Sequence, residues 1–240
     1  MKEVLQVSLL NGEGPILSIY NDKCIGAKIK EQYGLWEFQN TAILLGMCSS
    51  LPPLFGKINF IDIGAHVGYF SLLIGSRFPN VNVYAFEPDK NSFDLLKKNT
   101  QDFDNISVYN VAISDKSGVS DFFYCDDFEN NTGAGSLLEE EMIKTQSLDA
   151  NFNYKKTQTK TSTIDNFNID LSLFTIIKVD TQNTEEVIID SLSKILPQTF
   201  MLLTEKFPNV QDCFNKNKIS FMGATPISVW GQRIIKKQEG

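Results

Sequence analysis

The feature that most constrains the fold is a regular alternation, starting at residue 58, of short apolar runs with segments of helical length. Residues 58–63, 81–86 and 106–111 are rich in β-branched and aromatic side chains, which is typical of buried strands. Residues 67–77 and 92–99 carry apolar side chains at helical spacing. Strands that alternate with helices predict a parallel sheet with crossover helices.

The same alternation returns in the last third of the chain. Residues 174–179 and 200–204 are continuous apolar runs of the kind found in strands buried on both faces, and 185–196 between them predicts a helix. Residues 219–221 and 227–230 predict two closing strands joined through Gly223 and Pro226. We therefore expect an α/β fold with a doubly wound, mostly parallel sheet and a C-terminal antiparallel hairpin.

Two parts of the chain fall outside this alternation. Residues 1–56 predict an N-terminal extension that packs on the core, with short strands and an Asn11-Gly12 turn over 5–29 and one amphipathic helix over 37–48. Residues 57–240 form the one domain, which contains an insert at about 122–162, and within it the polar stretch 130–163 predicts loop and short strand. Long insertions of this kind often cover a functional site, so we expect the insert to face a substrate.

Composition excludes several classes of protein. The chain has 22 basic and 29 acidic side chains, giving a net charge of -7, which argues against binding to a nucleic acid. A single histidine and four cysteines without CxxC or HxxxH spacing offer no zinc site. No apolar run reaches the ~20 residues of a membrane span, and no secretory signal pattern is present. We expect a cytoplasmic protein with reduced thiols and a small-molecule or glycan partner.

The most informative segment is FIDIGAHVGYF at residues 60–70. A glycine directly after a buried strand, followed by a second at the helix start, allows a tight turn whose main-chain NH groups can face a ligand. A dinucleotide fold would need a further glycine where His66 stands, and the P-loop lysine is absent. Glu87 lies 23 residues after Gly64, where a carboxylate can bind the hydroxyls of a ribose. The pattern predicts a nucleoside site without a diphosphate.

These residues resemble the class I S-adenosylmethionine-dependent methyltransferases, and among them the FkbM-type methyltransferases. The matching segments, in chain order, are YGLWE (33–37), FIDIGAHVGY (60–69), AFEP (85–88), NVAISD (110–115), STID (162–165) and IKVD (177–180) followed by Glu185. Six segments in the right order make chance agreement improbable. The resemblance implies a Rossmann-like, seven-stranded sheet that binds S-adenosylmethionine and releases S-adenosylhomocysteine.

The resemblance also implies which residues hold the cofactor. Gly64, Ala65, His66 and Gly68 would line its methionine and ribose part, Glu87 would hold the ribose hydroxyls, and residues 110–112 would lie beside the adenine. The full set that we expect at the cofactor is Asp62, Gly64, Ala65, His66, Gly68, Tyr69, Glu87, Pro88, Asn110 and Ala112.

One segment departs from the family pattern. Where these proteins usually read Asp-Val-Glu/Gln-Gly-Ala-Glu, this chain reads DTQNTE at residues 180–185. Asn183 replaces the glycine, and asparagine tolerates a left-handed backbone well, so the turn can survive. Thr184 replaces alanine, which would narrow or repolarise the pocket and change the acceptor preference.

Two carboxylates are the candidates for the chemistry. Asp180 ends a strand at the carboxyl edge of the sheet, where open α/β folds bind ligands, and Glu205 ends the neighbouring strand. Asp180 is the first candidate for the base that takes the proton of an alcohol; the alternatives are positioning of the acceptor and a structural helix cap. A divalent cation held by Asp180, Glu185 and Glu205 is possible and not favoured, because Glu185 also suits the first turn of a helix.

Other side chains are candidates for acceptor binding. Trp36 and Glu37 either cover the cofactor or a sugar ring, or begin a helix packed on the core. Ser136 in the insert and Gln182 beside Asp180 complete the predicted substrate set. His66 would contact the methionine moiety, with a base role as the less favoured alternative.

The sequence thus predicts an S-adenosylmethionine-dependent O-methyltransferase that acts on a hydroxyl of a sugar, a glycan or another small metabolite. One alternative is an RNA or cap methyltransferase, which the net charge of -7 opposes. Another is a cofactor-binding partner subunit made inactive by its altered turn. A nicotinamide oxidoreductase is disfavoured by the missing glycine.

Overall fold

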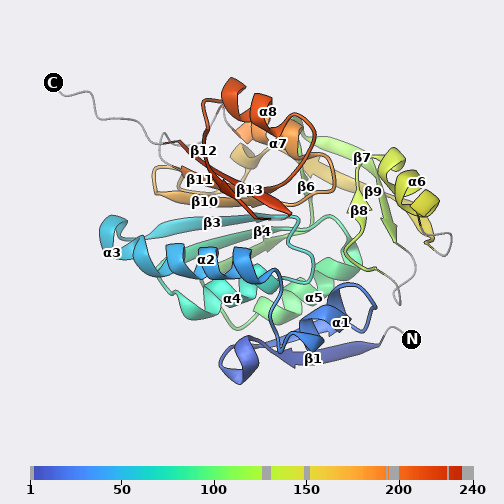
Figure 1. Cartoon of the computed structure of the whole chain (residues 1–240), viewed down its shortest axis with the longest axis horizontal. Helices are drawn as coiled ribbons and strands as arrows, with labels where there is room; N and C mark the ends of the chain where they lie inside the picture. Colours follow the sequence, from blue (N-terminus) through green and yellow to red (C-terminus); the bar gives the residue numbers. More distant parts are fainter. Residues whose placement is uncertain are drawn as a thin grey trace.

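The structure, a computed structural model, describes residues 3–125, 131–148, 152–192, 194, 200–225 and 227–233. Figure 1 shows a central sheet with helices on both faces and a smaller sheet at one end. No helix within the described residues is both long and apolar enough to span a bilayer.

Seven strands of the described chain form the central sheet, in the order β12-β13-β11-β10-β3-β4-β5. Their bounds are β3 Ile58–Ile63, β4 Val81–Phe86, β5 Ile106–Tyr109, β10 Thr175–Val179, β11 Phe200–Glu205, β12 Ser220–Ala224 and β13 Ser228–Arg233. β13 pairs antiparallel with both of its neighbours, and the other pairs are parallel. The predicted α/β fold with a mostly parallel seven-stranded sheet and a closing hairpin is confirmed.

Helices cover both faces of this sheet (Figure 1). On one face lie α2 (Phe38–Ser50), α3 (Pro52–Phe55), α4 (Tyr69–Arg77) and α5 (Lys90–Thr100). On the other lie α7 (Glu185–Leu192) and α8 (Val210–Lys216). β3 is at the centre and every one of its residues is buried, which explains its uninterrupted apolar pattern.

Several element ends differ from the predicted ones. α4 begins at Tyr69, not at residue 67, because His66 and Gly68 have φ angles of 51° and 88° and belong to the turn. α5 begins at Lys90, where Asp89 caps it by accepting a 2.8 Å hydrogen bond from the Ser92 main-chain NH. The helix expected over 185–196 ends at Leu192, and residues 193 and 195–199 lie outside the described chain, as does Pro226.

The N-terminal extension pairs β1 (Val4–Ser8) with β2 (Ile16–Tyr20) in an antiparallel hairpin. Asn11 and Gly12 are left-handed, as the predicted turn requires, within a connection that includes the short 3-10 helix η1 (Leu10–Gly12). Strands were expected as far as residue 29, and this is wrong, because Ile25–Glu31 forms helix α1. The hairpin packs on α5, where Ser18 exchanges two main-chain hydrogen bonds with the Asn99 amide.

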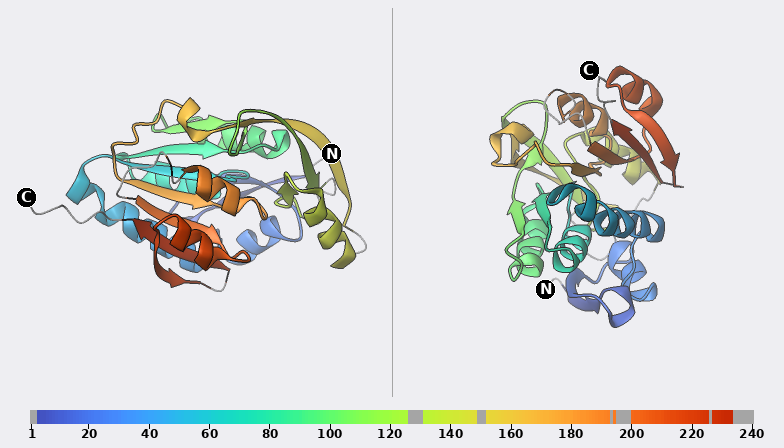
Figure 2. Two further views of the ribbon diagram at one scale, coloured as in Figure 1. Left: turned by 90° about the horizontal axis from the view of Figure 1, so that it is seen from above. Right: turned by 90° about the vertical axis from the view of Figure 1, so that its left-hand side faces the viewer.

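The insert is more regular than expected. Within the described residues it and its flanks form a four-stranded sheet in the order β6-β9-β7-β8. The bounds are β6 Ala112–Ile113, β7 Gly118–Cys125, β8 Gly135–Ser136 and β9 Tyr154–Ser162, with helix α6 at Glu139–Leu148 and a 3-10 helix, η2, at Ile164–Asn166. The prediction of loop and short strand over 130–163 is wrong for β9, which pairs with β7 from Tyr154 to Thr161. Figure 2 shows this small sheet and α6 at one end of the molecule.

Candidate active site

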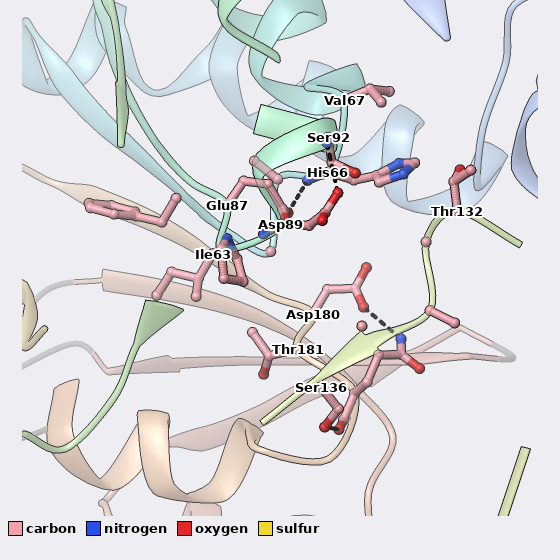
Figure 3. Close-up of a pocket in the computed structure, with 18 of the residues that line it drawn as sticks. Ile63, His66, Val67, Glu87, Asp89, Ser92, Thr132, Ser136, Asp180 and Thr181 are labelled. Carbon is pink, nitrogen blue, oxygen red and sulfur yellow. Dashed lines mark hydrogen bonds between the residues drawn. The ribbon is translucent and has the colours of Figure 1, made fainter. Parts of the chain in front are cut away.

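A cavity of about 240 Å³ lies at the carboxyl ends of β3, β4, β10 and β11. Its wall is completed by residues from the N-terminal extension, among them Trp36 and Glu37, and by residues 131–137 of the insert. In Figure 3, Glu87 and Asp89 lie on one side of the cavity, and Asp180 and Ser136 lie on the other. The ends of four strands, the N-terminal extension and the insert therefore meet at the edge where α/β sheets bind ligands.

The turn after β3 forms the floor of the cavity. Gly64 has a φ of 79°, and the main-chain NH groups of Gly64 and Ala65 both donate 3.0 Å hydrogen bonds to the Phe86 carbonyl. A Cβ on Gly64 would lie 1.8 Å from the Asp180 carbonyl oxygen. Only glycine allows this approach, which brings the turn and Asp180 together.

Glu87 faces the cavity from the end of β4. Its two carboxylate oxygens accept 2.8 Å hydrogen bonds from the main-chain NH groups of His66 and Asp89, which fixes the carboxylate in one orientation (Figure 3). Burial, assisted by the charge of Asp89, raises the pKa of Glu87 to about 8. Nearby, the Ser92 hydroxyl lines the cavity, is buried, and has no hydrogen-bond partner among the described residues.

Three residues expected at the cofactor do not line this cavity. Asp62 lies behind it, where its carboxylate accepts a 2.6 Å hydrogen bond from the Ser71 hydroxyl. Gly68 packs against Leu96, whose Cδ1 would lie 2.5 Å from an added Cβ. The Asn110 amide donates to the main-chain carbonyls of residues 87 and 88, and so holds the loop that carries Glu87. The other seven expected residues line the cavity: Gly64, Ala65, His66, Tyr69, Glu87, Pro88 and Ala112.

The His66 ring points away from Asp180, toward Thr132 of the insert (Figure 3). Its Nε2 atom is buried and has no hydrogen-bond partner in the described part of the chain. Burial lowers the pKa of His66, so the imidazole is neutral at physiological pH. This geometry favours the expected role of His66 as part of the cavity wall, and disfavours the alternative role as a base beside Asp180.

The opposite end of the cavity carries the two predicted catalytic carboxylates. Gln182 bridges them, because its Nε2 lies 3.4 Å from Asp180 Oδ1 and 3.4 Å from Glu205 Oε2. Burial, and then the charge of Asp180, raises the pKa of Glu205 to about 8. Two acidic groups of the same kind thus share one partner at the cavity wall.

Lys178 is a charged cavity residue that the sequence interpretation missed. Its side chain is 5% exposed, and its ammonium lies 3.0 Å from Asp180 Oδ2 and 3.7 Å from Asp62 Oδ1. Burial by itself would lower the pKa of Lys178, yet the negative charges of Asp180 and Asp62 outweigh it and raise the pKa. The ammonium stays charged. A lysine inside an apolar strand was the available signal, but its partners are identifiable only once the strand register is known.

The turn after β10 retains its shape despite its altered sequence. Gln182 and Asn183 have φ angles of 55° and 72°, so Asn183 takes the left-handed conformation predicted for it. Glu185 is buried, and its Oε1 accepts hydrogen bonds from the Thr181 main-chain NH at 2.8 Å and the Thr181 hydroxyl at 3.2 Å. Glu185 therefore stabilises the turn and the start of α7. Across the described residues no three side chains of His, Cys, Asp or Glu are placed to bind a metal ion together.

The four predicted acceptor residues all line the cavity. Glu37 begins α2 with a φ of 44°, and its carboxylate accepts a 2.8 Å hydrogen bond from Asn40. The Trp36 main-chain NH donates to the Tyr69 hydroxyl at 3.0 Å. The Ser136 hydroxyl donates to the Gln182 carbonyl at 2.9 Å, which ties the insert to the turn after β10. Their role in binding an acceptor stays a prediction.

Comparisons with known proteins agree with the motifs. The family described as the methyltransferase FkbM domain matches residues 62–216. Methyltransferase sdnD from Sordaria araneosa is 28% identical over 111 residues, which are 45% of this chain and 42% of that protein. This chain therefore aligns with less than half the length of that relative.

Solved structures of low sequence identity are also similar in part. A SAM-dependent methyltransferase from Agrobacterium tumefaciens is 7% identical, with 98% of this chain and 71% of that chain covered and a TM-score of 0.49. A 16S rRNA methyltransferase (RsmC) from T. thermophilus, in complex with AdoMet and guanosine, is 10% identical, with 97% and 50% covered and a TM-score of 0.48.

The family match covers well over half of the chain and includes the glycine turn, Glu87 and both candidate carboxylates. The resemblance expected from the six motifs is confirmed, and the chain belongs to the FkbM methyltransferase family.

Proposed function

We propose that this chain is an S-adenosylmethionine-dependent O-methyltransferase that acts on a hydroxyl of a sugar, a glycan or another small metabolite. The observation that carries the proposal is a single cavity, in a chain of the FkbM family, with a nucleoside-type end at Glu87 and a carboxylate end at Asp180 and Glu205. The first end suits a cofactor and the second suits an acceptor.

The residues of the first end fit the cofactor. The fixed Glu87 carboxylate keeps lone pairs free for the two ribose hydroxyls, and the buried Ser92 hydroxyl offers a hydrogen bond that the protein leaves unused. The turn at Gly64 and Ala65 leaves room beside the backbone for the methionine moiety. When bound, S-adenosylmethionine supplies a methyl group on a positively charged sulfur.

The residues of the second end suit a hydroxyl acceptor. Asp180 and Glu205 can each accept a hydrogen bond from a hydroxyl, and a carboxylate there can take the proton that an alcohol loses. Trp36 adds an aromatic surface of the kind that packs on a sugar ring. The enclosing segments hold the acceptor close to the cofactor and exclude water, which supplies much of the rate enhancement of a displacement reaction.

The charge of the site favours an uncharged or cationic acceptor over an anionic one. Glu37, Asp180 and Glu205 line the acceptor end, while Lys178 is the cation beside them and is paired with Asp180. A phosphate brought to this end would meet net repulsion. Together with the net charge of -7, this argues against RNA or a cap structure as the acceptor.

Calorimetry with S-adenosylmethionine and, separately, with NAD tests the cofactor assignment. We expect saturable binding of the sulfonium and none of NAD; the reverse result would overturn the proposal. A methyl-transfer screen over free glycosides, nucleotide sugars, small alcohols and cap analogues then tests the acceptor. Transfer to a neutral glycoside or alcohol supports the proposal, whereas transfer to a cap analogue alone supports the RNA alternative. Cofactor binding with no transfer to any acceptor supports an inactive partner subunit.

A further inference from the structure

The two carboxylates at the acceptor end differ in their partners. Asp180 forms a 3.0 Å ion pair with the Lys178 ammonium. Glu205 forms no ion pair with a lysine or arginine of the described chain, and its side-chain hydrogen bond there is the 3.4 Å one from the Gln182 amide. A cation therefore compensates the negative charge of Asp180, whereas none among the described residues compensates that of Glu205.

Lys178 cannot easily change partner. It is directly opposite Asp62 in the register of β3 and β10, and its ammonium lies between Asp62 and Asp180. The Phe70 ring from α4 lies under the ammonium, 5.3 Å from centroid to nitrogen. Three groups from two strands and a helix thus hold the cation on the Asp180 side of the site.

Glu205 is surrounded mainly by negative charge. The groups that face it are the carboxylates of Asp180 at the end of β10, Glu185 at the start of α7 and Glu37 at the start of α2, opposed by the single ammonium of Lys178. Burial and these carboxylates together make the Glu205 anion costly and its protonated form favourable. Asp180 differs from Glu205 because its carboxylate forms an ion pair with the buried Lys178 ammonium, 3.0 Å away.

A general base works best when its pKa lies near the working pH, and paired carboxyl groups whose environments differ usually divide the roles. An aspartate whose carboxylate is held by an ammonium and an amide is a good orienting group. We propose, on the basis of the function proposed above, that Glu205 takes the proton of the acceptor hydroxyl, while the Lys178–Asp180 pair orients that hydroxyl. Lys178 is a positioning residue that acts through Asp180.

The proton balance of the step is simple. The hydroxyl oxygen forms a bond to the methyl carbon, the bond from that carbon to sulfur breaks with its electrons remaining on sulfur, and the hydroxyl proton moves to a Glu205 carboxylate oxygen. The Gln182 amide, 3.4 Å from both carboxylates, keeps them on the same side of the acceptor. Glu205 then returns its proton to solvent before the next cycle.

The first test needs no acceptor. The carboxyl carbons of ¹³C-labelled glutamate are followed by NMR from about pH 3 to about pH 10, and the Glu205 signal is assigned by its loss in Glu205→Gln. We expect this signal to titrate near pH 8, to move to lower pH in Asp180→Asn and to higher pH in Lys178→Met. Glu186→Gln, which removes an exposed carboxylate outside the cavity, should leave it unchanged. Titration of Glu205 near pH 4.5 would overturn the assignment.

The second test uses the acceptor found in the screen. We expect kcat/KM of the wild type to rise with pH, and Glu205→Gln to lower kcat by roughly 10²- to 10⁴-fold and remove that rise. Asp180→Asn should keep the rise, at lower pH, and raise the KM of the acceptor. Lys178→Arg should retain more activity than Lys178→Met, because it keeps the charge.

The opposite pattern, in which Asp180→Asn removes the pH dependence and Glu205→Gln keeps it, would overturn the assignment and leave the proposed function intact. Failure of the wild type to bind S-adenosylmethionine would instead refute the proposed function. Thermal unfolding of each variant identifies any that fail to fold. If Lys178→Met does not fold, Asp180→Asn keeps the test decisive, because asparagine has nearly the same shape as aspartate.

Discussion

Replacement of Gly64 by alanine tests whether the cavity depends on close contact between two strand ends. Gly64 has a φ of 79°, and its added Cβ would lie 1.8 Å from the Asp180 carbonyl oxygen. That oxygen cannot move away freely, because the Asp180 main-chain NH donates a 3.0 Å hydrogen bond to the Ile63 carbonyl. The turn and β10 must therefore separate, or the turn must change its conformation.

The expected loss of stability has two parts. An alanine in a left-handed conformation costs about 1–2 kcal/mol, and overpacking in a close-packed site typically costs about 1–3 kcal/mol. The sum is about 2–5 kcal/mol out of the roughly 5–15 kcal/mol by which such a protein is stable. At about 2–4 °C per kcal/mol for a chain of this size, the melting temperature should fall by roughly 4–20 °C.

Two other glycines separate the two contributions in a thermal unfolding assay. Gly56 has a φ of 77°, but none of the described atoms would lie within 4 Å of its Cβ, so Gly56→Ala should show only the conformational cost. Gly46 is exposed within α2 and has similar free space, so Gly46→Ala should be stabilising by up to about 1 kcal/mol. If Gly64→Ala unfolds at the same temperature as Gly56→Ala, the close contact with Asp180 has no energetic role and our reasoning is refuted.

Three further predictions concern charged groups of the site. Glu87→Gln should weaken S-adenosylmethionine binding by about 1–3 kcal/mol, measured by calorimetry, because its amide NH2 replaces an oxygen that accepts a main-chain NH and leaves one acceptor fewer for the ribose; unchanged affinity would contradict the ribose assignment. Thr132→Val should speed hydrogen exchange in the insert, because the 2.5 Å hydrogen bond from the Thr132 hydroxyl to the Asp22 carboxylate is lost; unchanged exchange would mean that this bond does not hold the insert. Glu205 has a pKa of about 8, above its ordinary value of 4.5, so the folded state binds this proton more tightly than the unfolded state. The contribution of Glu205 to stability is complete below pH 4.5 and is lost as the pH rises through about 8. Glu205→Gln should therefore make the decline in melting temperature between these two pH values shallower.

The inner strands of the central sheet could be predicted because they are buried on both faces, as β3 and β10 are along their whole lengths. β3 and β4 have the bounds that the apolar runs indicate. The insert could not be predicted in this way. β9 has the sequence YKKTQTKTS and is mostly exposed, so it lacks an apolar pattern, and its partner β7 lies some 30 residues earlier in the chain. Its pairing depends on a long-range contact that a local pattern does not reveal.

Site residues that end a strand could be predicted from the sequence. Those that join the site only through the pairing of two strands could not. Glu87 and Asp180 end their strands at the sheet edge, which the motifs already indicate. Asp62 belongs to the segment that carries Gly64, yet it lies behind the cavity, where its carboxylate forms an ion pair with Lys178. Because β3 and β10 pair with Asp62 opposite Lys178, the lysine becomes part of the site.

The N-terminal extension and the insert, which lie outside the alternation of strands and helices, meet beside the cavity. One oxygen of the Asp22 carboxylate accepts hydrogen bonds from the main-chain NH groups that begin α1, and the other accepts one from the Thr132 hydroxyl of the insert. The N-terminal extension and the insert therefore meet at a single buried carboxylate, and each also contributes residues to the cavity wall. Because neither segment contributes a strand to the central sheet, substitutions in them can change which acceptor fits without altering how the sheet holds the cofactor. We therefore expect acceptor preference to depend on the residues that these two segments place at the cavity, and cofactor affinity to depend on the turns that follow β3 and β4.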